Sequence, residues 1–480
     1  MTSTTTDLHT YGGWRRSRSL GLGSLDTRQT IMLLSAMLAP LLAGLLIGVR
    51  AAMLLAPAAV VVALLSVARR GGALVLDAGL AWVRWRWADW RTHTVALGQM
   101  VTPMPQRWDL PGVLAPTRLL DVEDPGRGRI GVVWNQRSGH MTATLLLSPA
   151  GALLADPATV NRQISNWGHL LASLADDTAI QHAAVTIELV PEPGTQLVDH
   201  VQGRLSPSAP QLAQQVIGEL TAMAPRASAQ VRARLSLTCD PSLGASSPRE
   251  VPQAVAEVLR SLGGLTVSAA GAEVLRRASA TDLIRIVRTA YDVDAEPVSA
   301  GWEKLRWADA RPEHARDRYD HYQHDGSCSL SWVLLEAPRQ RVSHDVLVSL
   351  LSPGQYRRRV TLTYRTLPRD VAGALLEQEV NAAAVREEYK RRTRRDPTAR
   401  DRADASRAAR AAIEEAHGAG LVQWSLYVTT TAPSRAELAQ ARREVEQAAG
   451  HARLKLRLAY GGQAAAFAVG LPCGVYPDEA

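Results

Sequence analysis

Two long uncharged stretches dominate the hydrophobic pattern near the start of the chain. Residues 31–49 read IMLLSAMLAPLLAGLLIGV, residues 51–68 read AAMLLAPAAVVVALLSVA, and Arg50 is the single charge between them. Each stretch is just long enough to cross a hydrocarbon core of about 30 Å at about 1.5 Å per residue. The pattern therefore predicts a transmembrane helical hairpin over residues 31–68 that turns near Gly48-Val49-Arg50.

Basic residues on both sides of this hairpin indicate its orientation. Arg15, Arg16 and Arg18 precede the first stretch, whereas Arg69 and Arg70 follow the second. Because cytoplasmic flanks carry the excess of Lys and Arg, both termini are expected in the cytoplasm, with the protein in the cell membrane. A cleaved signal peptide fits poorly, since a second span follows the first. The remaining alternative is a buried hairpin in a soluble domain, but soluble core helices are rarely uncharged on every face.

The segment AWVRWRWADWRTH, residues 81–93, follows on the basic side of the hairpin. Amphipathic aromatic rings and arginines are typical of the headgroup layer of a membrane. We therefore expect membrane-interface anchoring by this set of residues: Arg15, Arg16, Arg18, Arg69, Arg70, Trp82, Trp85, Trp87 and Trp90. Two alternatives stay open, a structural tryptophan cluster packed on the soluble part and contact with nucleic acid.

The rest of the chain alternates strand-like and helix-like patterns. A strand hairpin is predicted at 129–149, and Asp156-Pro157 begins a helix. The stretch 229–239 alternates apolar and polar residues as a half-buried strand does. Ser279 and Asp282 form a capping box for the helix that follows.

A second unit echoes the first from about residue 300. It contains a predicted hairpin at 318–338 with an Asp325-Gly326 turn, a short helix capped by Ser343 and a strand at 357–368. Further patterns predict a long helical arm at 369–417 broken at Asp396-Pro397, a strand at 422–433, a helix at 434–449 and a hairpin at 453–472.

These patterns predict an α+β protein with antiparallel sheets, in which a transmembrane helical hairpin precedes two cytoplasmic α+β units. The expected boundaries are a basic cytoplasmic tail at 1–30, the hairpin at 31–68, a Trp/Arg segment with a Pro-rich linker at 69–112, a first unit at 113–298 and a second unit at 299–480.

The composition shows an excess of basic over acidic residues and few cysteines. The net charge is +8 and nearly all of the positive charge is arginine. Such an excess points to nucleic acid or anionic lipid, although an Ala- and Arg-rich composition by itself accounts for much of it. The three cysteines, Cys239, Cys328 and Cys473, are far apart and odd in number, which fits a reducing compartment rather than a disulfide framework.

Motifs that carry chemistry are absent from the sequence. It contains no G-x-x-x-x-G-K-[ST], no H-E-x-x-H and no G-x-S-x-G. His321, His324 and Cys328 lack a fourth zinc ligand, and the acidic group Asp292, Asp294 and Glu296 offers too few oxygens for calcium. We therefore expect no catalytic residue, cofactor or metal, and no enzymatic activity.

A run of arginines lies in the middle of the helical arm: Arg391, Arg392, Arg394 and Arg395. A run of this kind is typical of a solvated helix face, and it could also contact an acidic partner, either protein or DNA.

Several segments together resemble a family of actinobacterial membrane proteins encoded with conjugation and type IV secretion genes. They are YGGWRRSRSLGLGSLD, LPGVLAPTRLL, TATLLLSP, QISNWGHLLASLA, HYQHDGSCSLSWVLLEAP and VQWSLYVTTTAP. The resemblance implies a PrgI-like two-helix membrane subunit joined to a region similar to the N-terminal, non-ATPase part of conjugation ATPases. Since this chain carries no Walker motif, the resemblance also implies docking to a separate ATPase.

The expected function is therefore a non-catalytic inner-membrane structural component of a conjugative, type IV secretion-like transfer machine. Its expected partners are the ATPase, other membrane subunits, membrane lipids and further copies of itself, whereas direct nucleic-acid binding is not expected. One alternative is the membrane component of a type VII secretion complex. Another is a membrane-tethered DNA-binding or relaxase-like protein, which predicts strongly salt-dependent DNA binding.

Overall fold

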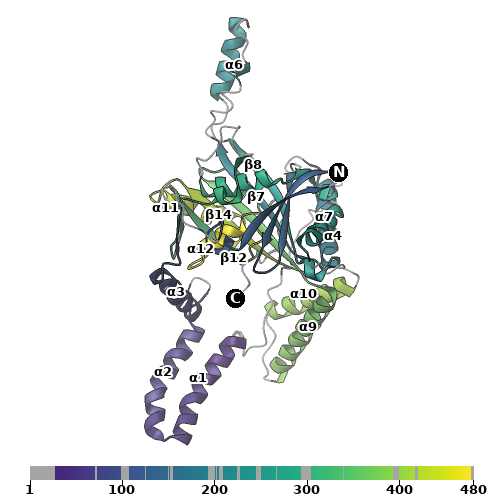
Figure 1. Ribbon diagram of the computed structural model, residues 1–480. Helices are drawn as coiled ribbons and strands as arrows, with labels where there is room; N and C mark the ends of the chain where they lie inside the picture. The colour runs from purple at the N-terminus through teal and green to yellow at the C-terminus, as the bar shows by residue number, and fades with distance from the viewer. Residues whose placement is uncertain are drawn as a thin grey trace.

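The computed structural model shows an α+β protein, in which a pair of apolar N-terminal helices is followed by a large antiparallel sheet with helices (Figure 1). It describes residues 14, 27–70, 73–98, 108–124, 126–149, 151, 155–192, 201, 203–204, 209–223, 228–244, 250–265, 267–292, 304–338, 340–392, 399–416 and 420–476. The predicted fold class is confirmed at this level.

The N-terminal pair consists of α1 (Thr27–Leu46) and α2 (Val49–Val67), which pack against each other along their length. Both helices are long and apolar enough to cross a membrane. The turn is shorter than predicted, because α2 already begins at Val49. Gly48 has a φ of 120°, a conformation that favours glycine. At the other end, the Gln29 side chain donates a hydrogen bond of 2.8 Å to the carbonyl of Ser66.

The first half of the chain supplies strands and helices of the following bounds: β4 (Thr117–Asp124), β5 (Gly128–Asn135), β6 (Met141–Pro149), α4 (Pro157–Asp176), β7 (Ile180–Glu192), α6 (Gln211–Met223), β8 (Ser228–Cys239), α7 (Val251–Gly263), β9 (Ala272–Arg277) and α8 (Ala280–Tyr291).

The second half supplies a comparable series: β10 (His314–Asp317), β11 (Tyr322–His324), β12 (Ser327–Glu336), β13 (Arg357–Thr366), α9 (Arg369–Arg392), α10 (Ala399–Ala416), β14 (Val422–Ala432), α11 (Leu438–His451), β15 (Lys455–Leu458) and α12 (Gln463–Val469).

The two halves arrange their strands in the same order. The first half reads β7-β8-β6-β5-β4 with β9 also paired to β6, and the second reads β13-β14-β12-β11-β10 with β15 also paired to β12. Instead of forming two separate sheets, the halves join through β7 and β13, which share eight antiparallel residue pairs from Arg358↔Leu189 to Arg365↔His182. Pairing these two strands satisfies backbone groups that would otherwise lie unpaired at two long sheet edges.

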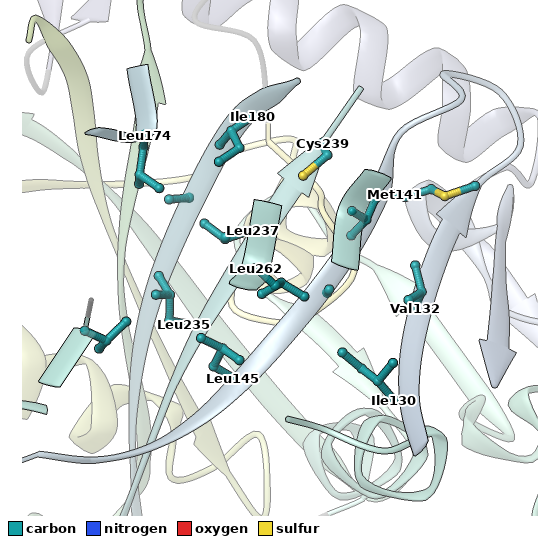
Figure 2. Close-up of a cluster of buried hydrophobic side chains, with 14 of the residues drawn as sticks. Ile130, Val132, Met141, Leu145, Leu174, Ile180, Leu235, Leu237, Cys239 and Leu262 are labelled. Carbon is teal, nitrogen blue, oxygen red and sulfur yellow. The ribbon is translucent and has the colours of Figure 1, made fainter. Parts of the chain in front are cut away.

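One face of this sheet is apolar and carries the outer helices. In the first half, Leu145, Leu235 and Leu237 pack with side chains of α4 and α7, such as Leu174 and Leu262 (Figure 2). In the second half, the equivalent core lies between β12, β14 and α11 and includes Trp332 and Val428. Alternation along the strands therefore identified this face correctly.

The other face is polar but equally buried, which differs from the half-buried strand predicted at 229–239. Thr144 shares a hydrogen bond of 2.9 Å with Ser236, and Ser331 shares one of 2.9 Å with Thr429 at the matching position of the second half. Helices α8 and α12 and the C-terminal segment up to Tyr476 cover these hydroxyl groups. The prediction of a half-buried strand was wrong because other segments cover the polar face, whose hydroxyls satisfy one another across the strands.

Most local predictions agree with the structure. The hairpins at 129–149 and 318–338, the Asp156 cap and the Ser279 capping box are all present. Three details differ. Ser343 precedes a run of turns rather than a short helix, and α11 begins at Leu438 rather than at 434. The predicted hairpin at 453–472 is strand β15 followed by α12, because β12 rather than a second local strand pairs with β15.

Candidate membrane anchor and connecting helix

A short ribbon and a helix connect the apolar pair to the sheet. Strand β1 (Arg69–Arg70) pairs with β2 (Ala73–Leu74), and α3 (Val75–Trp90) begins directly afterwards. The backbone of Arg69 and Arg70 thus lies between the end of α2 and the start of α3, while their side chains are not among the described parts of the chain. The Trp/Arg segment predicted next to the membrane is therefore a helix close to the second apolar span.

The inner face of α3 docks on the sheet through Trp85. Its indole ring lies edge-on to the ring of Tyr319 with centroids 5.5 Å apart, and its Nε1–H donates a hydrogen bond of 3.1 Å to the backbone carbonyl of Asp317. Gly461 approaches the same turn of the helix, near Ala81 and Trp85. Trp85 therefore fits the structural-cluster alternative, whereas its neighbours on the other face do not.

Asp89 fastens the end of the same helix. Its carboxylate accepts a hydrogen bond of 2.9 Å from Thr94 and one of 3.4 Å from Arg316 on β10. The hydrogen bond from Thr94, together with the nearby Arg316 charge, lowers the pKa of Asp89 despite some burial. Strand β3 (Val95–Leu97) then adds to the edge of the sheet by pairing with β10. The helix is thus held at both its middle and its end.

The outer face of α3 presents aromatic rings to the surroundings. Trp82, Trp87 and Trp90 are 49%, 54% and 73% exposed. The guanidinium of Arg91 lies 5.3 Å from the ring of Trp87 and 5.5 Å from that of Trp90. Exposed tryptophans with an arginine stacked on them form a surface that suits the polar–apolar boundary of a bilayer.

The structure thus separates the four predicted tryptophans into three that face outward and one, Trp85, that faces the sheet. The docking partners Tyr319, Asp317 and Arg316 were missed by sequence reasoning. They lie more than 220 residues from α3 along the chain, and no periodicity connects such distant positions.

The remaining predicted interface residues are less informative. Arg15, Arg16 and Arg18 lie outside the described residues, although the neighbouring Trp14 packs edge-on against Trp424 at 6.2 Å. Of the arginine run on the arm, Arg391 and Arg392 are exposed on α9, while Arg394 and Arg395 also lie outside the described residues.

A buried charged cluster occupies the centre of the polar face. Glu188 on β7 accepts a hydrogen bond of 3.2 Å from Arg234 on β8 and one of 3.0 Å from Arg357 on β13. Arg359 lies 3.9 Å from the same carboxylate and stacks on Phe467 at 4.3 Å. Burial alone would raise the pKa of Glu188, but the three arginines outweigh it and hold the pKa well below its usual range.

The same arginines also bind helix ends. Arg234 donates to the carbonyl of Gly470 at the end of α12, and Arg357 donates to the carbonyl of Thr289 near the end of α8. A cation at a helix C-terminus offsets the partial negative charge of the unpaired carbonyls. The cluster therefore joins β7, β8 and β13 to the two covering helices, which is a structural role.

The residues considered for zinc are engaged inside the protein. His324 is fully buried, its Nε2 lies 2.7 Å from Ser329 Oγ, and its Nδ1 contacts the carbonyl of Tyr291. Burial lowers the pKa of His324 to about 3. His321 contacts Asp320, and Cys328 is a free, buried thiol. In the part of the chain that the structure describes, no group of three His, Cys, Asp or Glu side chains is arranged to hold a metal ion.

Fold and anchor together define the class: a protein with two helices apolar enough to span a membrane, joined by a tryptophan-bearing helix to a large antiparallel α+β body. No protein-family model matches this chain, and no curated protein matches it either.

Proposed function

We propose that this protein is a membrane-anchored, non-catalytic structural component of a conjugative, type IV secretion-like transfer machine that docks a separate ATPase. The observation that carries the proposal is the continuous connection from the apolar helical pair, through α3, to the sheet. Trp85 and Asp89 fix α3 to the sheet, so a load on the body is transmitted to the anchor.

The anchor half of the proposal rests on the surfaces of α1 and α2. Their side chains are largely apolar and exposed, including Ile31, Leu45 and Leu54 at 60%, 82% and 79%. Such a surface is unfavourable in water and favourable in hydrocarbon. The arginines on both flanks favour cytoplasmic termini, and the outward rings of Trp82, Trp87 and Trp90 then lie at the cytoplasmic interface.

The non-catalytic half of the proposal rests on the polar groups of the body. Around the buried Glu188, Arg234 and Arg357 donate hydrogen bonds to that carboxylate and to helix-end carbonyls, and the hydroxyls of the polar face pair with one another. Burial raises the pKa of both Cys239 and Cys473 to about 12, so neither thiol is an activated nucleophile. A body of this kind supports other proteins through its surface, as the family resemblance of the sequence also implies.

Two measurements test the proposal. Membranes that contain the full-length protein should retain it after an alkaline carbonate wash, and release into the supernatant would refute the anchor. Crosslinking in intact membranes, followed by identification of the partners, should capture a conjugation-type ATPase. Capture of a type VII secretion ATPase instead would favour the alternative membrane complex, which has the same arrangement of two spans and a cytoplasmic body.

The DNA-binding alternative draws on the net charge of +8. It predicts that the detergent-purified protein binds duplex DNA with an affinity that falls steeply as salt is raised. Binding no tighter than that of an unrelated basic protein at moderate salt would exclude this alternative.

A further inference from the structure

Helices α9 and α10 follow β13 and precede β14 in the chain. Together they form an arm that projects toward the side on which α1 and α2 lie (Figure 1). Helix α6 follows β7 and precedes β8 in the chain of the first half, and it projects toward the opposite side (Figure 1). The two arm helices pack on each other, with Leu376, Ala382 and Ala408 buried. With 24 residues, α9 is about 36 Å long at about 1.5 Å per residue.

Charge is distributed unevenly along this arm. The described residues at the tip, 387–392 and 399–402, contain five basic and three acidic residues, a net charge of +2. The two parts nearer the sheet, residues 369–386 and 403–416, together contain four basic and six acidic residues, a net charge of −2. The positive charge is therefore concentrated at the end of the arm that is farthest from the sheet.

The described arginines of the tip are open to a ligand. The side chains of Arg391 and Arg392 are 73% and 79% exposed, and both pair with the single carboxylate of Glu388 at 3.0 Å. One carboxylate cannot neutralise two guanidinium groups, and exposed pairs of this kind are weak and exchange readily with other anions. Arg402, at the start of α10, is also exposed.

We propose that the tip of the arm binds the anionic phospholipid headgroups of the bilayer that holds α1 and α2. This inference rests on the proposed membrane anchoring. The cytoplasmic leaflet is negatively charged and attracts basic residues close to its surface. Because the anchor holds the body beside that leaflet, the tip meets it at a high effective concentration without first diffusing to it. The arm and the hairpin then form two separate contacts with one membrane, which limits tilting of the sheet.

The test uses the full-length protein reconstituted in vesicles of phosphatidylcholine, with or without phosphatidylglycerol, that carry a quencher on the lipid headgroups. A fluorophore is attached at Glu387→Cys, in the tip, or, as a matched control, at Glu414→Cys near the base of the arm. Both substitutions remove one exposed glutamate, and the native cysteines are buried and therefore protected from labelling. Quenching at position 387 should increase with phosphatidylglycerol, whereas quenching at position 414 should not change.

Removal of charge at the tip provides the second part of the test. Arg391→Gln and Arg392→Gln should each weaken the phosphatidylglycerol-dependent quenching by about fivefold, and added salt should weaken it further. Both arginines are exposed, so neither change should shift the unfolding midpoint. Equal quenching in the two kinds of vesicle, or quenching that persists without these arginines, would overturn the proposal. Quenching that requires added duplex DNA would also overturn it.

The same vesicles distinguish failure of this proposal from failure of the anchor. Protein that resists a carbonate wash but shows no quenching at the tip refutes the lipid contact of the arm alone. Protein that the wash releases refutes membrane anchoring itself.

Discussion

Glu188 on β7 and Arg357 on β13 share a hydrogen bond of 3.0 Å across the join between the two halves of the sheet. This pair belongs to a cluster in which one carboxylate faces three buried arginines. The sheet is therefore continuous not only through backbone pairing but also through a charged contact at its centre.

Removing the charge of Glu188 should destabilise the body strongly. We expect Glu188→Gln to lower the free energy of unfolding by about 3 kcal/mol or more, because the arginines around it would remain buried without a counter-ion. Denaturant unfolding of the detergent-purified protein, followed by tryptophan fluorescence, measures the change. The control is Asp121→Asn, which breaks the exposed pair of Asp121 with Arg129 and should cost less than about 1 kcal/mol. Equal losses in the two variants would show that the central carboxylate is not required.

Asp317 should make stability depend on pH. Burial raises the pKa of this carboxyl to about 6 in the folded protein, partly offset by a hydrogen bond of 3.1 Å from the backbone N–H of Ala464. The folded state therefore keeps a proton that the unfolded state loses above about pH 4. The contribution of Asp317 to the free energy of unfolding should therefore fall as pH rises from about 4 to about 6. Above that range this contribution should stay low.

The variant Asp317→Asn should remove that pH-dependent loss. Its amide oxygen can still accept the hydrogen bond from Ala464, but no charge is buried, so the variant should exceed the wild type in stability at pH 7 and match it near pH 4. Thermal unfolding of both proteins over this range measures the difference. Parallel curves would refute the role of Asp317 as the titrating group.

Gly98 should be intolerant of a side chain. A Cβ atom there would lie 2.7 Å from the Cα of Glu313 and 2.9 Å from its carbonyl oxygen, and both atoms belong to the backbone of the adjoining segment. We expect Gly98→Ala to destabilise the contact between β3 and β10 by about 1–3 kcal/mol. Limited proteolysis should then cleave the chain faster on either side of β3.

Gly79 provides the control for this change, because a Cβ at that position of α3 meets nothing within 4 Å. Gly79→Ala should leave proteolysis unchanged or slow it, since alanine favours a helix by up to about 1 kcal/mol over glycine. Equal cleavage rates in the two variants would mean that the contact at Gly98 is not tight.

The tryptophans of α3 should divide into two groups by their effect on stability. Trp85→Ala removes both the ring contact with Tyr319 and the hydrogen bond to Asp317, so it should lower the free energy of unfolding by about 2–3 kcal/mol. Trp90→Ala, at an exposed position, should change it by less than about 0.5 kcal/mol in detergent. A large loss for Trp90→Ala would instead show that the Trp90 ring, like that of Trp85, packs as part of the structural cluster.

Much of the fold could be predicted because its signals are local. The uncharged stretches on either side of Gly48, the hairpin turn at Asp325-Gly326 and the capping box of Ser279 each depend on neighbouring residues. Of the candidate anchor, the sequence indicated the spans and the tryptophans, but not that Trp85 faces the sheet. Helical periodicity shows which neighbouring residues share a face with Trp85. It does not show that this face contacts Tyr319, which is distant in the chain.

The sequence by itself therefore determined the apolar helical pair, local elements such as the hairpins at 129–149 and 318–338, and the side of each strand on which residues such as Leu235 and Arg234 lie. Only the tertiary structure decided that β7 and β13 join the halves into one sheet, and that the polar face with Arg234 is buried rather than solvated. The physical reason is that alternation divides the side chains between two faces, whereas burial of a face depends on which distant segment covers it and whether that segment can satisfy its polar groups.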